Sequence, residues 1–88
     1  MKVYRIVITR SAEKDFNVIP SHFIQRISRQ IDALAYEPRP KGCKKLKGES
    51  NLWRIRTGDY RIIYYIFEDT VLIKIVGISH RKDVYRNL

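Results

Sequence analysis

The amino-acid sequence predicts a compact α+β domain of order β-α-α-β-β-β, with two N-terminal helices packed on one face of an antiparallel sheet. Apolar and polar residues alternate with a period of two at the start of the chain and through its second half, as in strands. Between these regions, apolar residues recur at spacings of three and four, which is typical of an amphipathic helix. A chain of 88 residues supports one modest core, so we expect a single domain over residues 1–88.

Local signals near the N-terminus predict a strand and a short helix. Residues 2–9, KVYRIVIT, are rich in valine and isoleucine and are predicted to form the strand. Ser11 is a candidate N-cap, and Glu13 suits the first turn of the helix that follows. This helix should end before Pro20, because proline cannot donate the hydrogen bond that a helix interior needs.

A second, longer helix is predicted to begin at Ser21, which serves as its cap. Its apolar side chains form one stripe, made of Phe23, Ile24, Ile27, Ile31, Leu34 and Ala35. Pro38 and Pro40 stop this helix. The segment that follows, PRPKGCKKLKGES, is predicted to be a basic loop anchored by Leu46.

Three strands with intervening turns complete the expected fold. They are predicted at about residues 52–57, 60–67 and 71–78. The Gly58-Asp59 pair suits a type II′ hairpin turn, because glycine adopts the positive φ that this turn requires. Residues 68–70 form a looser second turn, which we expect to set Phe67 opposite Thr70.

The first of these turns sets the strand register and so decides which side chains share a face. It pairs Arg56 with Arg61, and because faces alternate along a strand, Arg54 lies on the same side. The opposite side carries apolar residues that the helices can cover, namely Trp53, Ile55, Ile62, Tyr64 and Ile66. The second turn adds Lys74 to the arginine side, where Tyr65 offers a ring for base stacking.

The arginine side carries an unfavourable arrangement of charge. Like charges directly opposite each other destabilise a sheet by roughly 0.2–1 kcal/mol per pair. No carboxylate on these strands is placed to neutralise the three arginines. Guanidinium groups bind phosphate through bidentate, charge-assisted hydrogen bonds, so we expect this face to bind an anion from outside the fold. An ordinary solvated sheet face is the alternative.

Positive charge is concentrated in two segments of the chain. Of the net charge of +9, residues 39–61 contribute +6, with eight basic and two acidic side chains. Residues 80–86 contribute a further +2. Such a field attracts polyanions, with nucleic acid first among them. A basic surface that only aids solubility and an acidic protein partner are the alternatives.

Several classes of protein are disfavoured by the sequence. No segment approaches the roughly 18 apolar residues of a membrane span, and the alternating N-terminus is unlike a secretion signal, so we expect a cytoplasmic protein without membrane association. The lone Cys43 is interpreted as an incidental thiol. Neither it nor His22 and His80 show metal-ligand spacing, and no glycine-rich phosphate loop is present. We therefore expect no metal and no cofactor.

The remaining groups suit RNA cleavage without a metal. In that reaction the 2′-hydroxyl of the RNA attacks the adjacent phosphorus, while the enzyme orients the chain, stabilises negative charge and moves protons. Arginines perform the first two tasks but stay protonated, so they are poor general bases. The C-terminal run SHRKDVYR adds His80, of a side-chain type that ordinarily titrates near pH ~6.5, and the phenol of Tyr85. A surface histidine and a packing tyrosine are the alternatives.

Over essentially its whole length, the chain resembles the RelE-type toxins of bacterial toxin–antitoxin pairs, in the RelE/ParE superfamily. The cues are SAEKDF after the opening strand, the basic block KKLKGESNLWRIRTGDYRIIY, and the ending GISHRKDVY. The resemblance implies a compact β-α-α-β-β-β fold, ribosome-dependent cleavage of mRNA, and a cognate antitoxin that binds through an acidic or amphipathic segment. It also implies that the toxin–antitoxin complex binds operator DNA through the antitoxin.

The resemblance further implies roles for individual residues. Arg54 and Arg56 match two basic residues that contact the RNA backbone, and Arg61 matches the stabiliser of the transition state. Arg81 and Tyr85 match a basic residue and a tyrosine near the C-terminus of the family, and both are expected to be catalytic.

This chain departs from the best-known RelE pattern at the two backbone-contacting positions, where that pattern has lysines. Because a lysine loses its proton more readily than an arginine, the identity of the general base is open, and His80 becomes a candidate for proton transfer. Further contacts with RNA are expected from Lys44, Lys45, Lys47, Lys74 and Lys82.

Two other functions fit the same sequence. Within the superfamily, a ParE-like toxin poisons DNA gyrase without cutting RNA, although such chains generally lack the full set of basic and tyrosine groups present here. Alternatively, the basic face belongs to a non-catalytic module that binds RNA or docks an acidic antitoxin segment.

Overall fold

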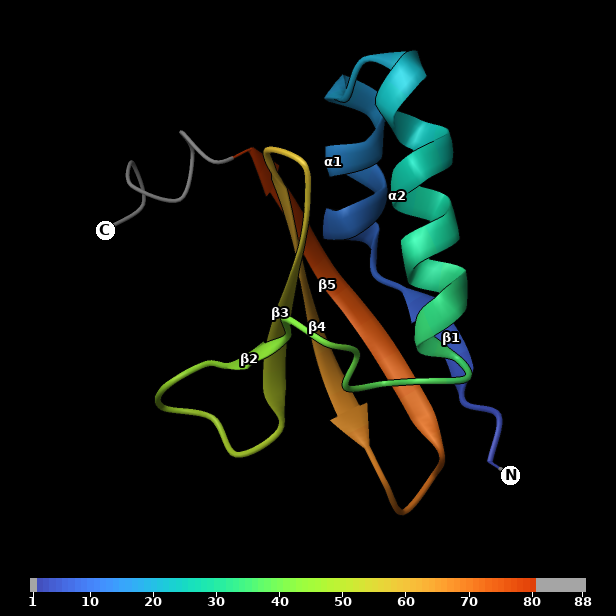
Figure 1. The fold of residues 1–88 in the computed structure, drawn as a ribbon, viewed down its shortest axis with the longest axis vertical. Helices are drawn as coiled ribbons and strands as arrows, with labels where there is room; N and C mark the ends of the chain where they lie inside the picture. Colours follow the sequence, from blue (N-terminus) through green and yellow to red (C-terminus); the bar gives the residue numbers. More distant parts are fainter. Residues whose placement is uncertain (1, 81–88) are drawn as a thin grey trace.

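The computed structural model describes residues 2–80, which form two helices packed on one face of a five-stranded sheet (Figure 1). In chain order the elements are β1 (Arg5–Ile8), α1 (Arg10–Val18), α2 (Ser21–Leu34), β2 (Lys44–Lys45), β3 (Leu52–Thr57), β4 (Tyr60–Phe67) and β5 (Leu72–His80). The sheet order is β1-β5-β4-β3-β2, and α1 packs against β5 whereas α2 reaches β3. The predicted α+β class and the placement of both helices on one face are confirmed.

The sheet is mixed, because its first strand runs parallel to its last. β1 pairs in parallel with β5, from Arg5 opposite Leu72 to Ile8 opposite Ile75, whereas β2, β3, β4 and β5 pair antiparallel to their neighbours. Parallel strands need a long crossover connection, and the chain between β1 and β5 includes both helices and the hairpins. The expected antiparallel arrangement therefore holds for β2 to β5, with β1 added at the edge.

The β3–β4 hairpin has the register that its turn predicts. Thr57 pairs with Tyr60, and Arg56 with Arg61. Gly58 has a φ of +62°, whereas Asp59 does not take a positive φ, which is the combination a type II′ turn requires. The expected register of this hairpin is confirmed.

The β4–β5 hairpin differs from the prediction by two residues. Phe67 pairs with Leu72 and not with Thr70, and the connecting loop ends at Val71, whose φ is +52°. A β-branched residue seldom adopts this conformation. Here the N–H of Arg5 on β1 donates to the Val71 carbonyl at 3.0 Å, so the neighbouring strand holds the turn in place. Lys74 still reaches the predicted face, because it pairs with Tyr65.

Three local predictions about the first half of the chain were wrong in detail. The N-cap of α1 is Thr9, whose Oγ1 accepts a hydrogen bond from the N–H of Ala12 at 3.2 Å, and not Ser11. The N-cap of α2 is Pro20, so Ser21 is the first helical residue and not the cap. The basic loop also contains a short strand, β2, which pairs with β3.

The core lies between the helices and the sheet face that was predicted to be apolar. From α2 it contains Ile27, Ile31 and Leu34, and from the sheet Ile55, Ile62, Tyr64, Ile66, Ile73 and Ile75. Each of these side chains stabilises the fold by roughly 1.5–3 kcal/mol through burial of apolar surface. This core fixes the orientation of the opposite sheet face, where the arginines project.

Polar contacts tie the loop after α2 to the sheet. The buried hydroxyl of Tyr64 donates to the Pro38 carbonyl at 2.7 Å, and burial raises the pKa of this hydroxyl, which therefore stays protonated. Arg39 forms a salt bridge with Glu68 at 2.8 Å and lies over the Trp53 ring, 5.1 Å from its centroid. The other Glu68 oxygen accepts a hydrogen bond from the Tyr4 hydroxyl at 2.6 Å. These contacts hold the start of the basic loop against the sheet.

Replacement of Tyr64 tests the contact with Pro38. Tyr64→Phe leaves the buried Pro38 carbonyl without its donor, which should lower the free energy of unfolding by about 1–3 kcal/mol in urea denaturation. Tyr36 is 63% exposed, so Tyr36→Phe should change stability by less than about 0.5 kcal/mol. Equal effects of the two substitutions would show that the Tyr64 hydroxyl does not secure the loop.

The dependence of stability on pH tests the contacts of Glu68. Hydrogen bonds from Tyr4 and then Arg39 hold the pKa of Glu68 below its ordinary value. The folded chain therefore binds this proton less tightly than the unfolded chain, and the stabilisation is lost as the pH falls through the lowered pKa. We expect the difference in unfolding free energy between the wild type and Glu68→Gln to shrink from about pH 6 to about pH 2.

The matched control is Glu49→Gln, because Glu49 is exposed and makes no hydrogen bond to another described side chain. The free energy of unfolding of Glu49→Gln should equal that of the wild type at every pH in this range. A difference for Glu68→Gln that stays constant over this pH range would contradict the account of its contacts.

Candidate functional site

Three arginines form a cluster on the sheet face that the helices leave uncovered. We call Arg54, Arg56 and Arg61 the arginine cluster. Arg56 and Arg61 are direct cross-strand partners, and Arg54 is two residues before Arg56 on β3, so strand alternation puts all three on one face. Ile55 and Ile62 lie between them on the opposite face and are buried in the core. The predicted convergence of the three side chains is confirmed by the register.

Burial differs across the arginine cluster, and Arg61 is the most enclosed member. Arg56 is exposed and Arg54 is half-buried, whereas Arg61 is only 8% exposed. Its Nε is buried and has no hydrogen-bond partner among the described residues. Within residues 2–80 the one salt bridge joins Arg39 to Glu68, so no described carboxylate neutralises Arg61 or Arg56.

A buried cation without a counter-ion is unfavourable for the fold and favourable for an incoming anion. Removing a charged group from water costs free energy unless it is paired, and buried polar groups in proteins nearly always have partners. In a medium of lower dielectric than water, the same guanidinium attracts a negative charge more strongly. An anion from outside the fold would therefore stabilise the charged, buried guanidinium of Arg61.

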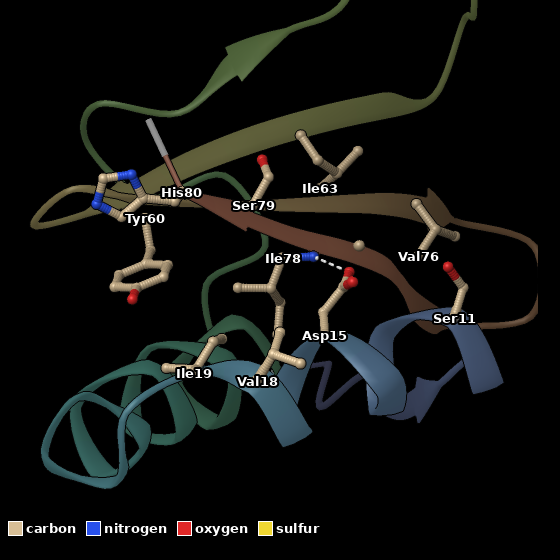
Figure 2. A pocket seen from close by; sticks show the side chains of 11 residues that line it. Ser11, Asp15, Val18, Ile19, Tyr60, Ile63, Val76, Ile78, Ser79 and His80 are labelled. Carbon is tan, nitrogen blue, oxygen red and sulfur yellow. Dashed lines mark hydrogen bonds between the residues drawn. The ribbon is translucent and has the colours of Figure 1, made fainter. Parts of the chain in front are cut away.

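Other side chains on the same face provide neutral and aromatic surface. Ser79 on β5 pairs directly with Arg61 and projects away from α1, as does Ile63 (Figure 2). Farther along β4, the rings of Tyr65 and Phe67 stack with centroids 5.7 Å apart. Lys74 is exposed and pairs with Tyr65. This row offers a flat aromatic surface beside a positive charge, which suits a nucleobase attached to a phosphate backbone.

The basic segment carries three further lysines for which RNA contacts are predicted, Lys44, Lys45 and Lys47. Lys44 and Lys45 form β2, and Lys44 pairs with Arg54, so it lies on the face of the arginine cluster. Lys45 pairs with Trp53, so strand alternation places it on the opposite face. Lys47 is exposed in the loop between β2 and β3. The sequence pattern did not predict β2, because two residues are too few to show a strand period.

His80 lies near the cluster but at the alternate register position. It pairs with Tyr60, whereas the adjacent Ser79 pairs with Arg61. Its ring meets the Tyr60 ring edge-on, with centroids 5.2 Å apart (Figure 2). Strand alternation therefore does not place the His80 side chain with the arginines. The other C-terminal residues with predicted roles, Arg81, Lys82 and Tyr85, lie outside the described residues.

A hollow of about 610 Å³ lies between α1 and the second half of β5 (Figure 2). β1 pairs with β5 only as far as Ile75. The residues of β5 after Ile75 therefore have no pairing with β1 on that edge. Two residues after a bulge at Val76 in β5, the N–H of Ile78 donates to a carboxylate oxygen of Asp15 on α1, at 2.9 Å. This contact fixes the end of β5 that carries Ser79 and His80.

Two absences are noted for the described part of the chain. No three His, Cys, Asp or Glu side chains within residues 2–80 are grouped so that they could hold a metal ion. None of the helices in this part is sufficiently long and apolar to cross a membrane.

This chain is similar to known toxins in its sequence. The family described as "ParE toxin of type II toxin-antitoxin system, parDE" matches residues 6–85. Toxin RelE3 of Methanocaldococcus jannaschii is 31% identical over 85 residues, which cover 92% of this chain and 94% of that protein.

Solved toxin–antitoxin complexes have the same fold. In the archaeal RelE–RelB complex from Pyrococcus horikoshii OT3, the matching chain is 33% identical with a TM-score of 0.80, over 90% of this chain and 96% of that one. In the RelBE2 complex from Mycobacterium tuberculosis, the matching chain is 25% identical with a TM-score of 0.79, over 90% of this chain and 99% of that one.

Proposed function

The chain belongs to the RelE/ParE family of toxins from type II toxin–antitoxin systems, and on this premise we propose that it cuts mRNA on the ribosome and so inhibits translation. The proposed chemistry is metal-free attack of the RNA 2′-hydroxyl on the adjacent phosphorus. The observation that carries the proposal is Arg61, a buried guanidinium whose Nε has no partner among the described residues. It is the group best prepared to receive a phosphate oxygen.

The residues of the arginine cluster divide two tasks between them in this proposal. Arg61 stabilises the negative charge that develops on the phosphorane, because a partly desolvated guanidinium needs no reorganisation when the charge appears. The more exposed Arg54 and Arg56 hold the RNA backbone so that the 2′-oxygen is in line with the phosphorus. Tyr65 and Phe67 provide a surface for a base next to the cut.

The reaction also needs two proton transfers. The 2′-hydroxyl gives its proton to a base as the new O–P bond forms, and the departing 5′-oxygen takes a proton as its bond to phosphorus breaks, which leaves a 2′,3′-cyclic phosphate. Arginines are poor proton acceptors. His80, Arg81 and Tyr85 are proposed for these transfers, with His80 adjacent in sequence to the residue that pairs with Arg61.

The proposed biological setting follows from the family. We expect a cytoplasmic toxin that is neutralised by a cognate antitoxin with an acidic or amphipathic segment. Charge complementarity supports this expectation, since the toxin carries a net charge of +9. The complex of both proteins would bind operator DNA through the antitoxin. RNA contacts beyond the cluster are proposed for Lys44, Lys45, Lys47, Lys74 and Lys82.

Substitution of Arg61 tests the catalytic proposal on programmed ribosomes. Arg61→Gln should slow mRNA cutting by about 10²–10³-fold, because one preorganised donor to the transition state is lost. Arg61→Lys keeps the charge but loses the planar fork, so it should recover only part of the rate. Lys14→Ala removes an exposed charge from α1 and should cut at the wild-type rate.

Urea denaturation of the same variants separates chemistry from folding, because Arg61 is buried. Both Arg61 variants should remain folded under the assay conditions. Cutting by folded Arg61→Gln at the wild-type rate would remove Arg61 from the mechanism.

Poisoning of DNA gyrase is the second candidate function, because the matching family is described as a ParE toxin. Expression of the toxin with and without its antitoxin, followed by mapping of transcript ends, distinguishes the two. We expect new ends within translated regions and in frame with the codons. Growth arrest with intact transcripts and a DNA-damage response would contradict the nuclease and favour gyrase.

A further inference from the structure

A second hollow, of about 310 Å³, lies beside the end of β3 that β2 leaves uncovered. β2 pairs with Trp53 and Arg54 only, so Ile55 and the two residues after it have no β2 partner. The hollow is bounded by α2, by the loop that leads into β2, and by β3. It lies at the opposite edge of the arginine cluster from Ser79 and His80, since β3 and β5 flank β4 on different sides.

The lining of this hollow is strongly positive. Lys41 and Lys44 line it from the loop and β2, and Arg54 and Arg56 line it from β3. No carboxylate is among the lining residues. Lys44 and Arg54 are moreover direct cross-strand partners, an arrangement of like charges that destabilises a sheet. An anion bound in the hollow would lie beside several positive side chains, which attract it.

The remaining lining indicates what kind of anion fits. Gln30 of α2 contributes an exposed amide, which can donate hydrogen bonds to an oxygen. At Gly42 an added Cβ would meet no heavy atom within 4 Å, so the mouth of the hollow is open beside the loop. No aromatic side chain lines it, which makes it unsuited to stacking a base. These features fit a backbone phosphate and not a nucleobase.

We propose that this hollow is a second phosphate subsite, which holds a phosphodiester of the RNA that flanks the one bound by Arg61. Gln30 and Lys41 are its distinguishing residues, and Arg54 and Arg56 connect it to the cluster. Arg54 and Arg56 are two residues apart on β3, which corresponds to about 6.7 Å along the strand. This spacing allows one extended RNA strand to contact both side chains. This inference rests on the proposed function, because it presumes that RNA lies along the arginine face.

A length series of 2′-O-methyl oligoribonucleotides, which cannot be cut, tests the subsite by fluorescence anisotropy. With wild-type protein, affinity should rise in a step at the length where the flanking phosphate first reaches the hollow. Lys41→Ala should remove this step, weaken the longer oligonucleotides about tenfold, and lower the slope of log affinity against log salt by about one. Gln30→Ala should reduce the same step without changing the salt slope. The shorter oligonucleotides should bind both variants as they bind the wild type.

Lys14→Ala is the matched control, because it removes the same charge from the exposed surface of α1. Identical length dependence for Lys41→Ala and Lys14→Ala would overturn the subsite while leaving RNA binding in place. Absence of wild-type binding at every length would instead count against the proposed function. Binding of a synthetic acidic peptide that Lys41→Ala weakens, with RNA binding unchanged, would assign the hollow to a protein partner and overturn the subsite.

Discussion

The register of the β3–β4 hairpin is the constraint on which the site depends. It is fixed by a two-residue turn in which Gly58 takes a positive φ, and it makes Arg56 and Arg61 cross-strand partners. Because side chains alternate between faces, a slip of β3 by one residue would turn Arg54 and Arg56 into the core and expose Ile55, while Arg61 on β4 stayed on its own face. The apolar face thus enforces the position of the arginines, even though the arginines themselves repel one another.

The repulsion is tolerated because the rest of the fold is stabilised elsewhere. The isoleucine-rich core between α2 and the sheet offsets two like-charge pairs, Arg56 with Arg61 and Lys44 with Arg54. The loop that carries the lysines is fastened by Tyr64 through the Pro38 carbonyl and by the Arg39–Glu68 salt bridge. These contacts hold the loop in place without using the side chains of Arg56 or Arg61.

The sequence predicted correctly the features of the fold that depend on neighbouring residues. The β3–β4 register and the face of the arginine cluster follow from Gly58 and from strand alternation, so both could be predicted. The β4–β5 register could not, because Val71 adopts a positive φ that disfavours its residue type and is held there by a contact with Arg5, far away in the sequence. The parallel position of β1 likewise depends on long-range pairing.

Two features of the candidate site were also beyond the sequence pattern. Arg61 is only 8% exposed whereas its cross-strand partner Arg56 is exposed, and nothing in the local sequence distinguishes the two. Gln30 lies on α2, outside the apolar stripe, and only the tertiary fold brings it beside β3. The charge of the side chains and the hydrophobic period of the sequence identify candidate binding residues. The tertiary packing decides which of these residues line the same hollow.

The central claim is that the enclosed guanidinium of Arg61 is reserved for a phosphate. The most direct measurement is nuclear magnetic resonance of the arginine side chains in a complex with an uncleavable RNA. The account predicts that the Arg61 Nε–H signal moves downfield and shows a scalar coupling to a phosphorus of the RNA. An Arg61 signal that stays unchanged at saturation, while those of Arg54 and Arg56 shift, would contradict it.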